Sequence, residues 1–289
     1  MRTWAVAIGL VLGAVGALPR GAGAQTDGPP IVPRTNPRAT VSQRIGVTDV
    51  SVTYNRPATR GRRIFGGLVP YGEVWRTGSD EATTLTVSTA FTIQGRPVDA
   101  GTYEVFSIPG PAEWQIILQR HKAQWGAYAY DPADDVVRVA VVPEVAARPV
   151  ESFSIAVDEV SAGGATLVLA WERTRVPVAL AVDTVGLVVP RLETAMQGPG
   201  KRPYFLGAMF YFENNLDLAT AARWMAAAVA ESPGHIGMLH RQALILERLG
   251  DTEGARRAAQ LSLDGAAASP APLREEYRRL NQAVLDRLK

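Results

Sequence analysis

Residues 55–84 read NRPATRGRRIFGGLVPYGEVWRTGSDEATT, and the rest of the chain divides around this stretch. It is too rich in glycine and proline to form one strand or helix, yet it holds a cluster of arginines and the aromatic residues Phe65, Tyr71 and Trp75. Long loops in compact domains are mostly functional or disordered, and disordered segments lack such apolar and aromatic content. We therefore expect an ordered loop laid across a β-rich scaffold, and we expect a binding site there.

The sequence on both sides of this loop alternates apolar and polar residues with a period of two, which is typical of half-buried strands. Val50, Val52 and Tyr54 alternate in this way before the loop, and Leu85 and Val87 do so after it. Further short runs, separated by turn residues, follow near 91–93, 103–107, 114–118, 136–142, 152–157, 165–171 and 176–182. About nine short strands without intervening helices predict an all-β antiparallel sandwich or barrel over residues 38–182.

The remainder of the chain is expected to be α-helical. Asp183 or Thr184 is a suitable cap for a linker helix within 183–203, with Pro190 kinking that helix or marking its start. The sequence DLATA from Asp217 lines up with DTEGA from Asp251 at a spacing of 34 residues, the period of tetratricopeptide helix pairs.

We therefore predict a tetratricopeptide-like segment over 204–289. Its helices are expected near 204–213, 218–231, 234–249, 252–267 and 272–287. Two such units are fewer than the roughly three of a stable array, so the segment is expected to pack on the β domain or on its last helix.

The N-terminal sequence predicts export. Arg2 precedes an apolar run over 4–18 that is short for a membrane span, and residues 22–24 (AGA) match the pattern that signal peptidase cleaves. We expect a signal peptide at 1–24, a proline-rich tether over 25–37, and a periplasmic or extracellular mature protein with no membrane span. The chain has no cysteine, so neither a disulfide nor a lipid-bearing thiol is expected.

Composition argues against several classes of partner. The signal segment holds Arg2 and Arg20 and no acidic residue, so 28 basic and 28 acidic residues remain in the mature chain. A nucleic-acid-binding protein needs a basic surplus on one face. A metal site of the usual nitrogen and sulfur type has little to draw on in a chain with three histidines and no cysteine. We expect no nucleic acid, no metal and no cofactor.

Arginines and aromatic residues are the candidate binding groups. Guanidinium groups bind carboxylates and phosphates through paired hydrogen bonds, and aromatic rings present flat, amphipathic surfaces to ligands. A single arginine is more often a solvated loop charge and a single aromatic residue more often part of the core, as we expect for Trp114 and Trp171. The candidate ligand-binding residues are Arg60, Arg62, Arg63, Trp75, Arg76, Trp125 and Tyr128.

Signals of catalysis are weak. The sequence has no Gly-x-Ser-x-Gly elbow, and no phosphate-binding glycine loop precedes a helix. His121 is the one histidine in the β region, and no partner is marked for it. Acid pairs such as Glu73 with Asp80 arise in any chain of this length. No catalytic residue is assigned.

Several strings of this chain are distinctive. In the β region they are RATVSQRIGVTDVSVTYNRP (38–57), GRRIFGGLVPYGEVWRTGSDEATT (61–84), AGTYEVFSIPG (100–110), WGAYAYD (125–131) and DVVRVAVVP (135–143). They resemble a bacterial exported family known as a domain of unknown function, over roughly residues 37–180. The helical tail, with YFLGAMFYFENNLDLATAARWMAAAV and LERLGDTEGARRAAQLSL, resembles the tail of many members. The resemblance implies the two-part layout and export, and it implies no catalytic residue.

We expect an exported, non-catalytic binding module. Its site lies on the arginine- and aromatic-rich loop and takes a small-molecule, glycan or peptide ligand, while the helical tail contacts the β domain or a protein partner. Two alternatives stay open. One is an envelope hydrolase acting on glycans or peptides through acids such as Glu73, Asp80 or Asp131 with His121, and the other is a purely structural envelope protein.

Overall fold

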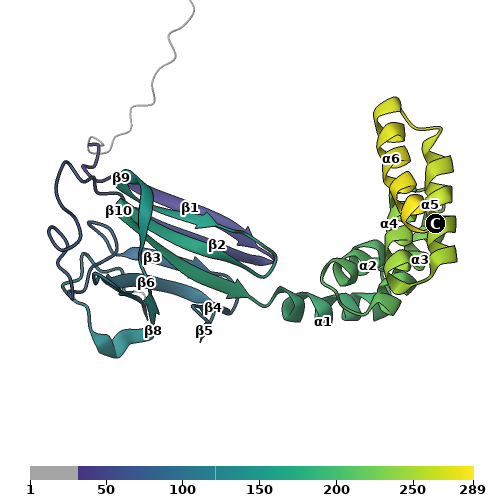
Figure 1. Cartoon of the computed structure of the whole chain (residues 1–289). Coiled ribbons are helices and arrows are strands. Elements are labelled where there is room, and N and C mark those ends of the chain that lie inside the picture. The colour runs from purple at the N-terminus through teal and green to yellow at the C-terminus, as the bar shows by residue number, and fades with distance from the viewer. Residues whose placement is uncertain (1–31, 121) are drawn as a thin grey trace, which may run out of the picture. The chain divides into compact units, whose positions relative to one another are not determined.

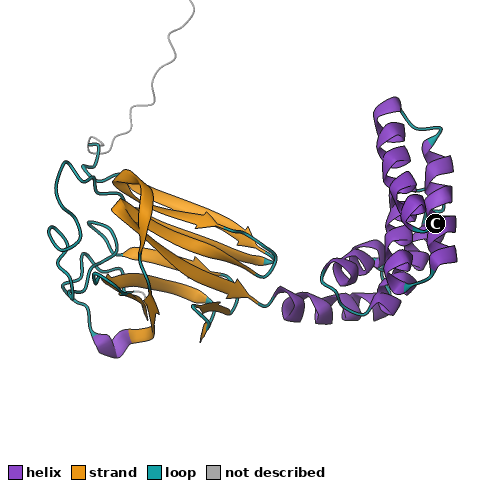
Figure 2. Cartoon of the chain, viewed as in Figure 1, coloured by secondary structure: helices purple, strands orange, loops and turns teal. Residues whose placement is uncertain are grey.

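The computed structural model describes residues 32–120 and 122–289. The predicted signal peptide and residues 25–31 of the predicted tether lie outside this part. Figure 2 shows strands in the first part of the described chain and helices in the second. This layout confirms the predicted antiparallel β region followed by an α-helical segment.

The described β region contains ten strands in two sheets (Figure 1). One sheet has six strands in the order β1-β2-β3-β6-β7-β8, and the other has four in the order β5-β4-β10-β9, with antiparallel pairing throughout both. The strands are β1 Arg38–Ile45, β2 Thr48–Asn55, β3 Thr83–Val87, β4 Phe91–Ile93, β5 Arg96–Val98, β6 Gly101–Ile108, β7 Trp114–Arg120, β8 Asp135–Val141, β9 Glu144–Asp158 and β10 Gly164–Val182.

The inward faces of the two sheets share one hydrophobic core. Val50 and Val52 of β2 bury against it from the six-stranded sheet, and Leu167 and Leu169 of β10 do so from the four-stranded sheet. Each pair is two residues apart, because successive side chains of a strand point to opposite faces. The β region is therefore a two-layer sandwich, one of the two predicted architectures.

Strand β10 corrects one sequence prediction. The polar run around Glu172 resembles a turn and predicts two strands, yet β10 continues through it as one strand of 19 residues. The pairing with β9 shifts register on both sides of Glu172, whose φ is 53°, as in a β-bulge. A bulge adds unpaired residues without ending the strand, so the polar run marks a bend rather than a break.

Six helices follow in the described chain, and the first is the predicted linker helix. They are α1 Thr184–Gln197, α2 Tyr204–Glu213, α3 Leu218–Glu231, α4 Ile236–Leu249, α5 Thr252–Ala266 and α6 Ala271–Arg287. The Asp183 side chain caps α1 by accepting from Gly186 N at 2.8 Å, and Pro190 lies inside this helix.

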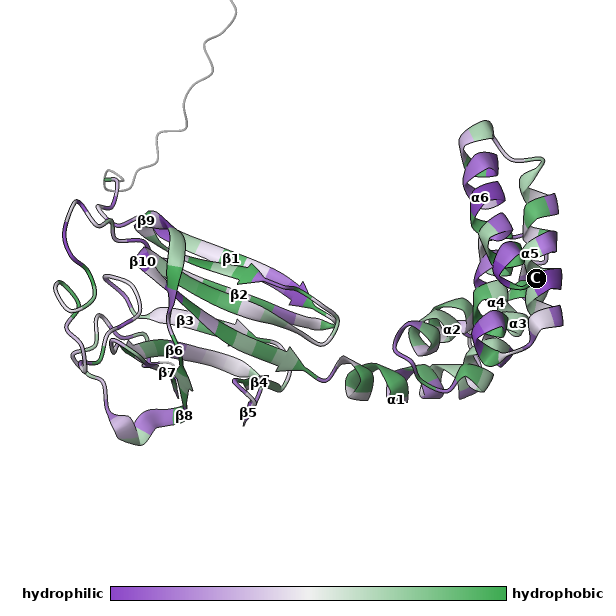
Figure 3. Ribbon diagram, in the orientation of Figure 1, coloured by the Kyte–Doolittle hydropathy of each residue, from purple (hydrophilic) through white to green (hydrophobic). Residues whose placement is uncertain are grey.

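The aligned repeat positions have equivalent roles in the structure. Asp217 caps α3 and Asp251 caps α5, and four residues later Ala221 and Ala255 are both fully buried. The last helix supports the segment by packing on α5 and α4, with Val284 in their shared apolar cluster. Most residues of this helix are hydrophilic (Figure 3). The assignment to tetratricopeptide repeats stays a prediction.

Candidate functional site

The loop between β2 and β3 is ordered because its first residues run along the free edge of β9. Pro57 O accepts from Phe153 N at 2.9 Å, and Thr59 N donates to Glu151 O at 2.8 Å. Tyr54 precedes them and bonds both backbone groups of Ile155 with its hydroxyl. An edge strand exposes unpaired N–H and C=O groups that must be covered. The loop covers this edge and is thereby held in place.

A carboxylate on β9 anchors the arginine-rich part of the loop. Glu151 accepts from Thr59 Oγ1 and, at 2.9 Å, from Arg60 N. These hydrogen bonds, the one from Thr59 first, lower the pKa of Glu151. Arg62 turns back onto its own loop and donates to Thr59 O at 2.9 Å and Ala58 O at 2.8 Å. Two of its five N–H groups are thus used locally, and the Arg60 side chain makes no hydrogen bond or ion pair with a described residue.

Trp75 belongs to the core of the sandwich rather than to an exposed platform. It is 9% exposed and stacks on Trp171 at 5.9 Å between ring centroids. Phe65, Trp114 and Phe153 surround it edge-on at 5.7, 6.2 and 5.3 Å. Aromatic pairs in such geometry stabilise beyond their buried area. The cluster fixes the loop from inside, and the core assignments of Trp114 and Trp171 are confirmed.

A strained turn follows Trp75. Thr77 has φ of 52° and Asp80 has φ of 57°, a left-handed conformation that is a genuine outlier for a β-branched residue such as threonine. Side chains hold this turn: Trp75 Nε1 donates to Gly78 O at 3.0 Å, and Thr77 Oγ1 bonds Ser107 Oγ of β6 at 2.9 Å. Such strain costs about 1–3 kcal/mol per residue and gathers at functional sites.

The β2–β3 loop, its strained turn and the aromatic cluster line a pocket of about 390 Å³. The buried rings of Trp75 and Trp171 contribute to its lining, and Asn36 and Ser79 add polar groups. The segment 68–70 and Val74 supply an apolar wall. Its charged lining residues are Arg60, Arg62, Glu73 and Arg76. The predicted loop therefore forms a concave site that has a positive balance.

Arg76 stands out among these residues. Its Nε is buried and has no hydrogen-bond partner, one of three such side-chain atoms in the described chain. The other two are Asn55 Oδ1 and Gln124 Oε1, and both residues contact the same segment: Asn55 Nδ2 donates to Ser79 O, and Gln124 O accepts from Ala82 N, each at 3.0 Å. Buried polar groups are nearly always paired, so a group of exceptions calls for an explanation.

Three predicted site residues lie outside this pocket. Arg63 turns toward Gly66 and Tyr71, on another part of the loop: a Cβ on Gly66 would stand 3.2 Å from Arg63 Nη2 and 2.5 Å from the Tyr71 ring. Trp125 and Tyr128 are 60% and 86% exposed on the loop between β7 and β8. A Cβ on Gly126 would lie 2.7 Å from the Tyr128 ring and 3.4 Å from Arg76 Nη1, so this second loop borders the guanidinium group of Arg76.

The β7–β8 loop covers the outer face of the six-stranded sheet. Phe106 of β6 and Ile117 of β7 are fully buried beneath it, against Ala127 and Tyr130. Tyr130 donates to Asp135 and accepts from Arg138; burial, followed by the bond to Asp135, raises the pKa of Tyr130 to about 12.

A buried polar cluster lies beside this small core, and the sequence analysis missed it. Glu104 of β6 is fully buried and accepts from Gln124 N at 2.7 Å and Gln124 Nε2 at 2.6 Å, while Gln119 Oε1 accepts from Gln124 Nε2 at 2.9 Å. The string YEVFS over 103–107 carries apolar residues at both odd and even positions. That pattern indicates a strand covered on both faces, which was the available signal.

Of the acids in the alternative hydrolase hypothesis, Glu73 alone lines the pocket. Asp80 accepts from Asn36 Nδ2 at 3.1 Å. Asp131 caps the short 3-10 helix Pro132–Asp134. His121 lies outside the described residues. Within the described chain no group of three or more metal-ligating side chains occurs, and no helix there has the length and hydropathy to cross a membrane.

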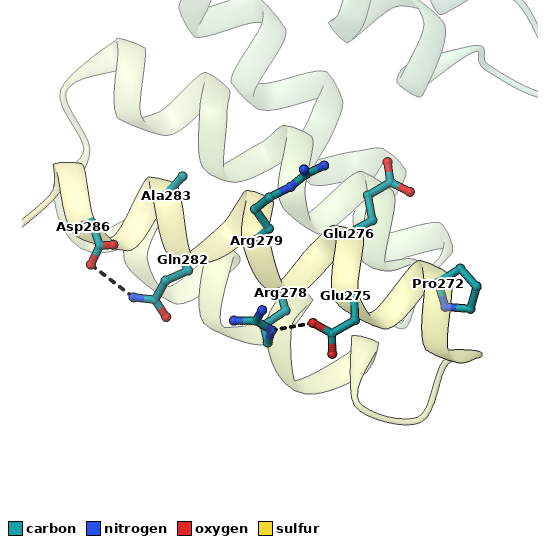
Figure 4. A pocket seen from close by; sticks show the side chains of 8 residues that line it. All are labelled: Pro272, Glu275, Glu276, Arg278, Arg279, Gln282, Ala283 and Asp286. Carbon is teal, nitrogen blue, oxygen red and sulfur yellow. Dashed lines mark hydrogen bonds and ion pairs between the residues drawn. The ribbon is translucent and has the colours of Figure 1, made fainter.

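A larger hollow of about 570 Å³ runs along α6 but is a weaker candidate. Figure 4 shows its eight lining residues, all from this helix and its first turn, with Glu275 paired to Arg278 and Gln282 bonded to Asp286. No second element contributes to its lining, and Glu275, Arg278 and Asp286 already pair along the helix. Ligand sites are usually concave and partly apolar, which favours the β-domain pocket.

The fold and the pocket define a two-sheet antiparallel β domain with a small, arginine-lined cavity, continued by a helical segment. The model of the family described as "Protein of unknown function (DUF2911)" matches residues 36–180, and the chain belongs to this family. The match spans the β domain and includes the whole loop that forms the cavity. No curated protein and no solved structure matches the chain.

Proposed function

We propose that this protein is an exported, non-catalytic binding module whose β-domain pocket holds a small ligand bearing a carboxylate or phosphate group. The observation that carries the proposal is the buried, unpartnered Nε of Arg76, a residue that lines the cavity together with Arg60 and Arg62. The N-terminal sequence supports export, and the poverty of catalytic signals supports binding over turnover.

The unpaired nitrogen has an energetic consequence. A buried donor without a partner costs about 1–3 kcal/mol, and more when it is charged. An oxyanion beside Arg76 removes that cost and gains a charge-assisted hydrogen bond, which is stronger than a neutral one. The free protein is thus destabilised at the position where an anion is stabilised, and the net gain on binding is correspondingly large.

The surrounding loop is rigid enough to keep this arrangement. Trp75 is locked in the aromatic cluster on one side of Arg76, and Thr77 is locked to Ser107 on the other. A site whose donors are held in place before binding avoids the entropic cost of ordering them. The strain at Thr77 and Asp80 is consistent with a loop shaped for its ligand rather than for its own stability.

The test is calorimetric titration of the chain with inorganic phosphate and with hexanoate, a carboxylate with an apolar tail. Arg76→Gln removes the positive charge and the N–H donors of the guanidinium group. We expect the affinity for both probes to fall about 10- to 100-fold, the effect of losing a charge-assisted hydrogen bond. Arg96→Gln is the matched control, because Arg96 is an exposed arginine of β5 outside the pocket.

Two outcomes contradict the proposal. Equal binding of every probe by Arg76→Gln and the wild-type chain removes Arg76 from the site. No binding by the wild-type chain, together with a change in the melting temperature of Arg76→Gln alone, supports the purely structural alternative.

A further inference from the structure

The pocket contains unpaired charges of both signs. Glu73 carries a carboxylate, and Arg60 and Arg76 carry guanidinium groups, and all three residues line the cavity. Arg76 Nε has no hydrogen-bond partner, and the Arg60 charge acts on Glu151 outside the cavity lining rather than on Glu73. A sphere of about 390 Å³ is only about 9 Å across. Opposite charges at that range usually pair with each other when their side chains can reach. Here they stay apart on the walls of one cavity.

A ligand with a single negative charge satisfies only half of this arrangement. Its oxyanion is attracted by Arg76 and Arg60 but repelled by Glu73, which shares the cavity. A ligand that also carries an ammonium group turns that repulsion into attraction. The charge pattern therefore selects a dipolar molecule over a simple anion, in the same way that matched charges give specificity at other interfaces.

The remaining walls indicate the third part of the ligand. Leu68 is 47% exposed at the apolar segment that reaches Pro70, and Val74 is a further apolar lining residue. The cavity volume is near the lower end of small-ligand sites, which run from about 300 to 1,000 Å³. It suits a compact molecule with one apolar side chain.

We propose that the pocket binds a free α-amino acid with an apolar side chain. Its carboxylate lies at Arg76 and Arg60, its ammonium group at Glu73, and its side chain against Leu68 and Val74. This inference rests on the proposed binding of an anionic ligand and adds the need for a positive charge on the same molecule.

Three probes with the same side chain separate the contributions: L-leucine carries both charges, N-acetyl-L-leucine only the negative one, and L-leucinamide only the positive one. By calorimetric titration of the whole chain we expect L-leucine to bind tightest. N-acetyl-L-leucine should bind about fivefold more weakly, because an exposed ion pair contributes up to about 1 kcal/mol. Leucinamide should bind least, since it has no anionic group for Arg76, whose Nε is buried and unpartnered.

Substitution of Glu73 gives the decisive comparison. In Glu73→Gln we expect L-leucine to lose its advantage over the N-acetyl form, while N-acetyl-L-leucine binds at least as well as before. Glu113→Gln removes an exposed carboxylate outside the pocket and should leave the preference unchanged. Melting curves of both variants check that they fold.

The results distinguish this inference from the proposed function. If the wild-type chain binds N-acetyl-L-leucine as tightly as L-leucine, or if Glu73→Gln keeps the preference, the amino-acid assignment is wrong while the anion site stands. If neither leucine form, hexanoate nor phosphate binds, both proposals fall together.

Discussion

Replacement of Tyr54 by phenylalanine tests whether the loop is held by the edge of β9. The Tyr54 hydroxyl donates to Ile155 O at 3.2 Å and accepts from Ile155 N at 2.9 Å, joining β2 of one sheet to the edge strand of the other. Tyr54 and Ile155 are each 5% exposed. Phenylalanine keeps the ring and its edge-on contact with Phe153, so only the two hydrogen bonds are lost.

The expected loss of stability is the cost of two buried backbone groups left without partners. Each such group costs about 1–3 kcal/mol, and the ring leaves little room for water to replace the hydroxyl. We therefore expect Tyr54→Phe to lower the free energy of unfolding by about 2–6 kcal/mol in total. For a domain of this size each kcal/mol lost lowers the melting temperature by roughly 2–4 °C.

Urea unfolding followed by tryptophan fluorescence is the suitable assay, because Trp75, Trp114 and Trp171 lie buried in the β domain. Tyr128→Phe is the control: its ring is 86% exposed, and its loss of a hydroxyl should change stability by less than about 0.5 kcal/mol. A Tyr54→Phe variant within that same margin of the wild type would refute the reasoning that the loop is pinned through this edge.

Three further predictions concern the turn, the sheet hairpin and the helical segment. Trp75→Phe removes the hydrogen bond to Gly78 O, so we expect the free energy of unfolding in urea to fall by about 1–3 kcal/mol and hexanoate to bind more weakly by titration calorimetry. Unchanged values would show that this bond does not hold the turn. Gly164→Ala places a Cβ about 2.6 Å from Leu180 O, and the backbone shift that follows should lower the free energy of unfolding by about 1–3 kcal/mol and so lower the melting temperature. An unchanged melting temperature would contradict this close approach. His240 is buried, and burial is the main cause that lowers its pKa, so the unfolded chain binds a proton at this histidine more readily than the folded chain. The stability of the helical segment should therefore be full above about pH 6.5 and should fall as the pH drops through the folded pKa of His240. By helical circular dichroism, His240→Gln should lose less stability than the wild type between about pH 7 and pH 5. Equal losses in the two proteins would exclude this histidine as the cause.

Local patterns predicted most of the scaffold. The alternation of Val50, Val52 and Tyr54 placed β2 and its inward face, and the 34-residue repeat that begins at Asp217 and Asp251 placed two helices. Such signals are readable because burial repeats with the period of the element itself. The polar run at Glu172 predicted a turn where the chain forms a bulge, because bulges and turns contain the same kinds of residue.

The candidate site was predicted only as a list of residues. The sequence indicated that the arginine- and aromatic-rich loop was ordered, but not which of its side chains meet. Arg60, Arg62, Trp75 and Arg76 line one cavity, whereas Arg63 lies elsewhere on the same loop. Neighbours in sequence point to different sides of an irregular loop, and no periodicity governs where they lie.

The sequence by itself determined the class of each segment, the faces that are buried and the region in which to look for a site. Tertiary structure alone decided the shape of that site, because distant strands hold the loop: Ile64 N donates to Glu172 across 108 residues, and Asn55 reaches Ser79 across 24. It also left Arg76 Nε without a partner and placed Glu73 in the same cavity lining as three arginines. Burial is encoded in local patterns, whereas the pairing of individual polar groups depends on contacts formed only when the whole domain has folded.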